Sequence, residues 1–279
     1  MAMRPLICAA AAASGLTLAM PAMAFYDLFD RGFIVPQYWT GEENTPVRGS
    51  HAEVQRAIVD GQLRLQSKGY ADNDSNTGAT TVRHAMITRP LGTIVGMSGR
   101  ITAVTASATG CSSNPTPTVI RARLFGYFFN AGPARPGTNY NDVFAMAQVS
   151  RSSASTDLPD VLRVNAFVGQ CLNDDCSQTK TLTSLDLGTV RKGEAVHLSV
   201  DWSQYWNRFT FGHRFDWQTW DYHHFQYDVS DQAAATVSTK RLEVSSQIAH
   251  CMPTRASAHG IVDFDEVIFP EEIQTSSLR

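Results

Sequence analysis

The chain has 279 residues, of which 26 are acidic and 23 are basic, so its formal net charge is −3 at neutral pH. A weakly acidic protein without a cluster of lysines and arginines is poorly suited to bind phosphate backbones or anionic membrane surfaces. We therefore expect no nucleic-acid partner.

The first 24 residues have the pattern of a cleavable secretory signal peptide. Arg4 precedes an uncharged apolar run from Leu6 to Met20, and the small residues Ala22 and Ala24 form an A-x-A cleavage pattern. The run is shorter than the roughly 20 apolar residues that cross a bilayer, which disfavours a membrane anchor. We predict cleavage after Ala24, export to the periplasm or the extracellular space, and no membrane span in the remaining chain.

After the signal, apolar and polar residues alternate in many short stretches, which is the period of a half-buried β-strand. Asp60-Gly61 marks a tight hairpin between the first two stretches. Loops rich in Gly, Pro, Ser and Thr are expected at 106–117 and 131–141. The expected strands are, in chain order, 54–59, 62–67, 100–105, 118–130, 143–149, 162–168, 196–200, 208–211, 240–246 and 260–269.

No helical period is sustained for ten residues after the signal, and no repeat or composition break divides residues 25–279. About a dozen strands in a chain of this length close into two packed sheets. We predict a single all-β domain over 25–279, folded as a two-sheet antiparallel β-sandwich or jelly roll.

Four cysteines remain once Cys8 leaves with the signal, and an even number in an exported chain indicates disulfides. Cys171 and Cys176 enclose a polar Leu-Asn-Asp-Asp hairpin tip, so we pair them locally. Cys111 and Cys251 then form a long-range disulfide. A four-cysteine zinc site is the alternative, but it needs two close pairs and the chain has one.

Several motifs follow one another in a familiar order: Asp27–Asp30, Ile58–Leu65, Val196–Trp202, Asn207–Phe211 and Val262–Val267. Together they resemble a concanavalin A-like (laminin-G-like) jelly roll over nearly all of residues 25–279. The later segments Tyr227–Asp231 and Lys240–Val244 extend the resemblance to a poorly characterised group of bacterial secreted proteins. The resemblance implies the fold of that group and no established activity.

Glucan hydrolases of this fold need two carboxylates flanking the scissile bond, usually on one strand as Glu-x-Asp-x-x-Glu. The sequence has no such motif, and the spacing of Asp263 and Asp265 occurs on the closing strand instead. No Gly-x-Ser-x-Gly, His-Glu-x-x-His or phosphate loop is present. His223 and His224 are adjacent, so on a strand they face opposite sides and do not readily chelate one metal. We therefore favour a protein that is not an enzyme.

Four of the five tryptophans lie between Trp202 and Tyr227. Within this segment, Phe209 and Phe211 share a face and are expected in the core. The aromatic residues that follow are interleaved with Gln, Asp and His, which suits a surface that stacks on sugar rings and binds their hydroxyls. The alternative is that these rings pack inward over the edge of the sandwich. The predicted ligand-binding residues are Trp217, Trp220, Tyr222 and His224.

In many jelly rolls of the resembling kind, a structural calcium ion joins the first and last strands. Asp27 and Asp265 match that pattern here, and carboxylates with backbone carbonyls suit calcium. The resemblance thus implies calcium as a cofactor, although these aspartates also fit a role as turn caps facing solvent.

We expect an exported, noncatalytic recognition domain whose partner is a carbohydrate or another envelope-associated ligand. Two alternatives stay open. One is a polysaccharide-acting glycoside hydrolase or lyase with an unrecognised site, and the other is a structural cell-surface protein.

Overall fold

The computed structural model describes residues 25–44, 52–89, 94–133, 135–216, 218–230, 233–235 and 239–270. The predicted signal peptide lies outside these ranges. Within them, no helix has the length and hydropathy of a membrane-crossing segment.

The described residues form two antiparallel sheets. Sheet A has the order β13 (Asp221–Gln226), β12 (Arg208–Phe215), β11 (Ala195–Ser203), β6 (Gly96–Thr109), β16 (Ser257–Phe269), β4 (Gln62–Tyr70) and β3 (Ala52–Val59), with β1 (Phe25–Asp27) beside β16. Sheet B has the order β10 (Thr179–Arg191), β9 (Val161–Cys171), β8 (Asp142–Ser152), β7 (Val119–Asn130), β15 (Lys240–Ala249), β5 (Ala79–Thr88) and β2 (Trp39–Asn44), with β14 (Ala233–Ala234) beside β7. The predicted all-β fold, a two-sheet antiparallel sandwich, is confirmed.

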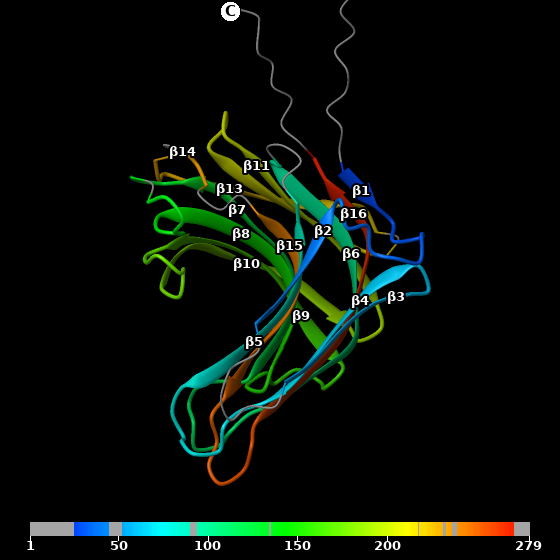
Figure 1. The fold of residues 1–279 in the computed structure, drawn as a ribbon, viewed down its shortest axis with the longest axis vertical. Coiled ribbons are helices and arrows are strands. Elements are labelled where there is room, and N and C mark those ends of the chain that lie inside the picture. The colour runs from blue at the N-terminus through cyan, green and yellow to red at the C-terminus, as the bar shows by residue number, and fades with distance from the viewer. Residues whose placement is uncertain are drawn as a thin grey trace, which may run out of the picture.

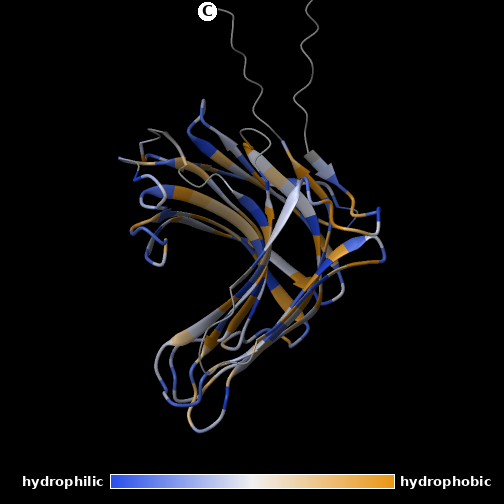
Figure 2. Ribbon diagram, viewed as in Figure 1, coloured by the Kyte–Doolittle hydropathy of each residue, from blue (hydrophilic) through white to orange (hydrophobic). Residues whose placement is uncertain are grey.

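The core lies between the sheets because alternate residues of many strands are apolar, which gives these strands their banded colouring (Figure 2). Leu162, Val164, Ala166 and Val168 of β9 are fully buried, and so are Phe209 and Phe211 of β12, as predicted. Since successive side chains point to opposite faces of a sheet, the residues between these apolar positions form the outer faces.

The sheets follow the sequence pattern closely at the hairpins. Asp60 and Gly61 both have positive φ, 51° and 75°, which is the two-residue turn that a right-twisted hairpin needs. The predicted loop at 106–117 is shorter than expected, because β6 continues to Thr109. There Ala106 is buried and Ala108 pairs with Ala258 of β16, so small residues extend the strand.

Two long strands of sheet B, β5 and β10, are absent from the predicted set. In β5 the inward position His84 is polar; its ring is fully buried and its Nε2 lies 3.4 Å from Nε of Arg56, so the apolar alternation is interrupted. In β10 the register shifts between Thr181 and Thr183 and between Asp186 and Gly188. Each shift moves the following residues to the other face and hides the period.

Both predicted disulfides are present, Cys111–Cys251 and Cys171–Cys176. The first joins the start of the loop after β6 to the loop after β15, and the second closes the hairpin between β9 and β10.

Sheet B is strongly curved, and its outer face is the concave side of the crescent visible at the left of Figure 1. The strands β5, β15, β7, β8, β9 and β10 cross this face side by side. Their outward side chains line a groove of about 530 Å³, a volume within the usual range of ligand sites.

Candidate binding groove

Cross-strand pairing arranges the outer face of sheet B, which holds the groove, into three rows of side chains. What we call the polar row contains Glu243, Arg123, Gln148, Asn165 and Asp186. The basic row contains Arg83, Ser245, Arg121, Ser150 and Arg163. The aromatic row contains Arg241, Phe125, Met146, Phe167 and Ser184. Neighbouring rows are two residues apart along each strand, so a ligand lying along the strands would touch all three.

A buried carboxylate organises the arginines at the centre of the floor. Glu243 is fully buried, and its Oε1 accepts hydrogen bonds from Nε of Arg123, at 2.8 Å, and from Nη2 of the same guanidinium. Its Oε2 lies 2.8 Å from Nε of Arg241. Burial alone would raise the pKa of Glu243, but the two guanidinium groups outweigh it and hold that pKa well below its usual range. Glu243 is therefore a fixed anion.

Arg121, in the next row, differs because it has no ion-pair partner among the described residues. Burial and the charge of neighbouring Arg123 lower the pKa of Arg121 to about 10, and the more distant Glu243 compensates only in part. The side chain is still cationic at neutral pH. The side chain is half-buried and lines the groove. It would therefore bind an anion in the groove more strongly than it binds water.

The aromatic row lies beside a cluster of buried rings. Phe125 stacks on Phe144 with 5.3 Å between ring centroids, and Phe144 stacks on Phe167 at 5.9 Å. The hairpin closed by Cys171–Cys176 packs against this cluster, so the disulfide forms one wall of the groove. Phe167 is only half-buried and leaves part of its ring available to a ligand.

Several polar atoms of the groove are buried yet make no hydrogen bond within the described part of the chain. They are Nε of Arg83, Oε1 of Gln148 and Oγ of Ser245. Buried polar groups nearly always have partners, so each such atom calls for an explanation. All three belong to the lining of the groove, where a polyhydroxylated ligand would supply the partners.

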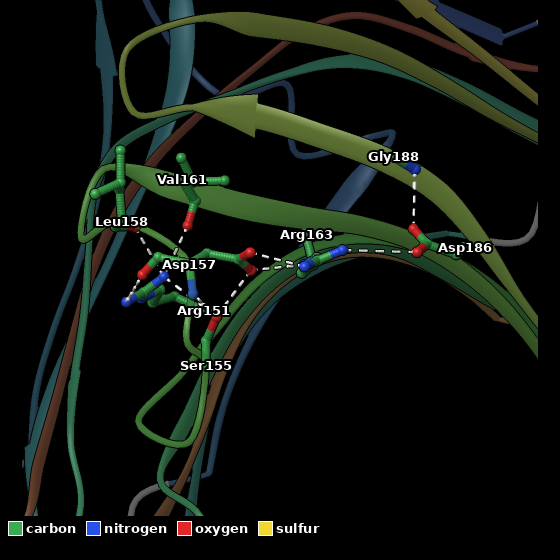
Figure 3. A network of polar contacts seen from close by, with 8 residues as sticks. All are labelled: Arg151, Ser155, Asp157, Leu158, Val161, Arg163, Asp186 and Gly188. Carbon is green, nitrogen blue, oxygen red and sulfur yellow. Dashed lines mark hydrogen bonds and ion pairs between the residues drawn. The ribbon is translucent and has the colours of Figure 1, made fainter.

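The far end of the basic row is already satisfied by the protein. Arg163 holds Asp157 through two hydrogen bonds of 2.6 and 2.7 Å and lies 3.7 Å from Asp186 (Figure 3). Arg151 ties the loop between β8 and β9 by donating to carbonyls of Leu158 and Val161, both at 3.0 Å. This network braces the rim and leaves Arg163 less available to a ligand than Arg121.

The sequence-predicted ligand residues lie elsewhere, on the outer face of sheet A. Trp220 and Tyr222 stack with 5.9 Å between ring centroids over Gly212, whose lack of a side chain leaves room for them. Nδ1 of His224 lies 3.0 Å from Oγ1 of Thr210 on the same face. Tyr222 is 52% exposed and Trp220 is half-buried. Trp217 lies outside the described residues.

The predicted calcium ligands are not brought together. β1 pairs with β16 as predicted, with Asp27 opposite Val267. Asp27 turns inward, where its carboxylate accepts a 2.7 Å hydrogen bond from Nε1 of Trp39 and another from the amide of Phe29. Asp265 lies on the outer face, next to Gln62 and 3.8 Å from Arg100. The two carboxylates thus face opposite sides of sheet A, and calcium binding there stays a prediction.

Sequence reasoning missed the groove residues, although a signal for them exists. β7 reads Arg121-x-Arg123-x-Phe125-x-Tyr127 and β15 reads Arg241-x-Glu243-x-Ser245-x-Gln247. Charged, polar and aromatic residues at every second position indicate an outer face that can bind a ligand. What the pattern could not reveal is that β15 and β7 are neighbours.

No known family model matches the chain, and neither does any curated protein sequence. Solved structures that align with it include lectin II from Ulex europaeus, at 9% identity and a TM-score of 0.32 over 81% of this chain and 97% of the lectin. The legume lectin-like domain from Entamoeba histolytica aligns at 8% identity and a TM-score of 0.36, over 79% of this chain and 91% of that domain. A beta-1,3-glucanase from Mycobacterium marinum aligns at 11% identity and a TM-score of 0.40, over 88% and 99% of the two chains. All three TM-scores are below 0.5, so we base the function on the groove itself.

Proposed function

We propose that this protein is an exported, noncatalytic recognition protein that binds acidic polysaccharide along the concave groove of sheet B. The observation that carries the proposal is Arg121. This half-buried cation has no ion-pair partner within the described part of the chain, and it lies beside buried polar atoms that make no hydrogen bond to the described residues.

The ligand class follows from the chemistry of the three rows. Gln148, Asn165 and Ser245 offer amide and hydroxyl groups that match sugar hydroxyls. The half-buried ring of Phe167 offers a flat apolar surface for the C–H face of a sugar. These groups run across an open face of six strands, which suits an extended chain better than a compact small molecule.

The charge of the lining favours an acidic sugar. Four arginines and one aspartate, Asp175, are among the lining residues, and Glu243 beneath them offsets one further charge. Guanidinium groups form paired, charge-assisted hydrogen bonds with acidic groups such as carboxylate, and a neutral sugar lacks the opposite charge that strengthens them. We therefore expect Arg121 to contact the acidic group of the ligand.

Among the described residues, the buried carboxylate beside the groove, Glu243, is not suited to act as the proton donor of a retaining hydrolase. Such enzymes need a proton donor and a nucleophile about 5.5 Å apart. Glu243 is buried beneath arginines that lower its pKa, so it holds no proton to donate near neutral pH. This favours binding over hydrolysis.

The outer face of sheet A carries the alternative surface for a sugar. The stacked rings of Trp220 and Tyr222, with His224 beside them, remain the sequence-predicted place for a sugar to stack. The two disulfides support export, because such bonds persist in oxidising compartments.

The test is a glycan array with acidic and neutral polysaccharides, followed by analysis of each bound glycan for new reducing ends or unsaturated sugars. We expect binding to acidic glycans and intact chains after prolonged incubation. Released products would replace the proposal with a hydrolase or lyase. Failure to bind any glycan would favour a structural cell-surface protein.

A further inference from the structure

Three metal-ligating side chains meet at the free edge of sheet A. His213 of β12 lies directly opposite Asp221 of β13, and His223 follows on the same face of β13. One ligand atom from each of these residues lies within 4.8 Å of the other two. Nε2 of His223 is 3.4 Å from Oδ2 of Asp221, already close to the spacing of two ligands on one ion.

Two imidazole nitrogens of this cluster are buried without a hydrogen-bond partner in the described part of the chain. They are Nδ1 of His213, a residue only 8% exposed, and Nε2 of His223. The ring of His213 also packs against Phe215, whose ring lies 5.2 Å away edge-on. Within the described residues, Nδ1 of His213 therefore makes no hydrogen bond, and the only ion-pair neighbour of Nε2 of His223 is the Asp221 carboxylate, although buried polar groups normally have hydrogen-bond partners.

The alternation of the strands separates this cluster from the aromatic surface described above. His213 and His223 lie on the face that carries Phe211, whereas Tyr222 and His224 lie on the opposite face. The adjacent pair His223-His224 is therefore divided between two sides of the sheet. His223 finds its partner across the strands instead.

Two imidazoles and one carboxylate form a donor set suited to a transition-metal ion of the zinc class, with Zn–N and Zn–O distances of about 2.0–2.2 Å. We propose that His213, Asp221 and His223 bind one divalent transition-metal ion that ties the edge strand β13 to β12. The two histidine rings are stacked nearly parallel, at 16° with centroids 5.5 Å apart. Binding one ion would therefore require the rings to rotate about their Cβ–Cγ bonds until both nitrogens point at it. Asp221 is mostly exposed and free to follow.

The test is calorimetric titration of the protein with Zn²⁺, using a chain without a polyhistidine tag that has been freed of metal by a chelator. We expect one Zn²⁺ per chain and a melting temperature raised by stoichiometric Zn²⁺. His223→Gln and Asp221→Asn, which are less buried than His213, should each weaken Zn²⁺ binding at least tenfold. His224→Gln, on the same strand but the opposite face, should bind Zn²⁺ like the parent.

Circular dichroism of each apo variant checks that the fold is intact. Co²⁺ in place of Zn²⁺ should give visible absorption bands in the parent and in His224→Gln, but not in His223→Gln. The proposal is overturned if the parent shows no saturable Zn²⁺ binding. It is also overturned if His223→Gln and Asp221→Asn bind as the parent does, or if His224→Gln alone removes binding.

Discussion

Glu243 lies directly opposite Arg123 across β15 and β7, and its fully buried carboxylate accepts two hydrogen bonds from that guanidinium. Arg241 approaches the other carboxylate oxygen at 2.8 Å. One anion thus fixes two cations beneath the groove, whereas Arg121, which has no ion-pair partner among the described residues, remains available to a ligand.

Glu243→Gln should destabilise the protein strongly. The substitution leaves Arg123 and Arg241 buried without their counter-charge, and breaking a buried pair by removing one partner typically costs about 3–5 kcal/mol. Urea unfolding followed by tryptophan fluorescence measures the loss.

Glu42→Gln is the matched control, because Glu42 also pairs with an arginine of sheet B, Arg83, but both side chains are about one-third exposed. We expect a loss below about 1 kcal/mol there. Equal losses for the two variants would show that burial of Glu243 does not set the strength of its ion pairs.

The carboxylate of Glu243 should make the unfolding free energy depend on pH in the acidic range. Burial would raise the pKa of Glu243, but Arg123 and Arg241 lower it from 4.5 to about 2. Because the pKa of Glu243 is lower in the folded state, its ionised carboxylate stabilises the protein at pH values above its pKa in the unfolded chain. This contribution is lost as the pH falls from about 4.5 towards 2. The gap in unfolding free energy between the parent and Glu243→Gln should therefore shrink over that window. A gap that stays constant from pH 7 to pH 3 would contradict the assignment.

Much of the fold could be predicted because burial in a two-sheet sandwich follows a period of two. The alternation at Leu162–Val168 and the Asp60-Gly61 turn were sufficient to place β9 and the first hairpin. β5 and β10 escaped prediction because tertiary contacts override the pattern: His84 points inward to meet Arg56, and bulges shift β10.

The sites could be predicted less well, because they depend on which strands are neighbours. Glu243 and Arg123 are 120 residues apart in the sequence, and only the β15–β7 pairing brings them together. The prediction of a sugar-binding surface relied on local aromatic density instead. It identified Trp220 and Tyr222, whose arrangement on one face is local to a single hairpin.

Removal of the two disulfides should have unequal effects. Chain-entropy estimates give about 5 kcal/mol for a crosslink such as Cys111–Cys251, with a sequence separation of 140, and about 2 kcal/mol for Cys171–Cys176, with a separation of 5. Urea unfolding of the two double alanine variants tests this order. Mass spectrometry that finds four free thiols in the unreduced protein after signal removal would contradict both pairings.

Two aromatic substitutions separate the groove from the sequence-predicted surface. Phe167→Ala removes a ring from the groove and should lower affinity for an acidic glycan severalfold. Trp220→Ala should leave that affinity within about twofold, because Trp220 lies on the outer face of sheet A. Isothermal titration of both folded variants makes the comparison. The reverse result would place the ligand on the Trp220–Tyr222 surface.

The most direct test of the proposed function is a titration of the parent and Arg121→Gln with a uronic-acid oligosaccharide and a neutral one of the same length. Loss of one charge-assisted contact should weaken acidic-glycan binding about 10- to 100-fold, without lowering the unfolding free energy. Arg163→Gln, whose guanidinium is already held by Asp157, serves as the control and should bind like the parent. Equal affinity of the folded Arg121→Gln and the parent, or equal binding of neutral and acidic oligosaccharides, would contradict the groove as an acidic-glycan site.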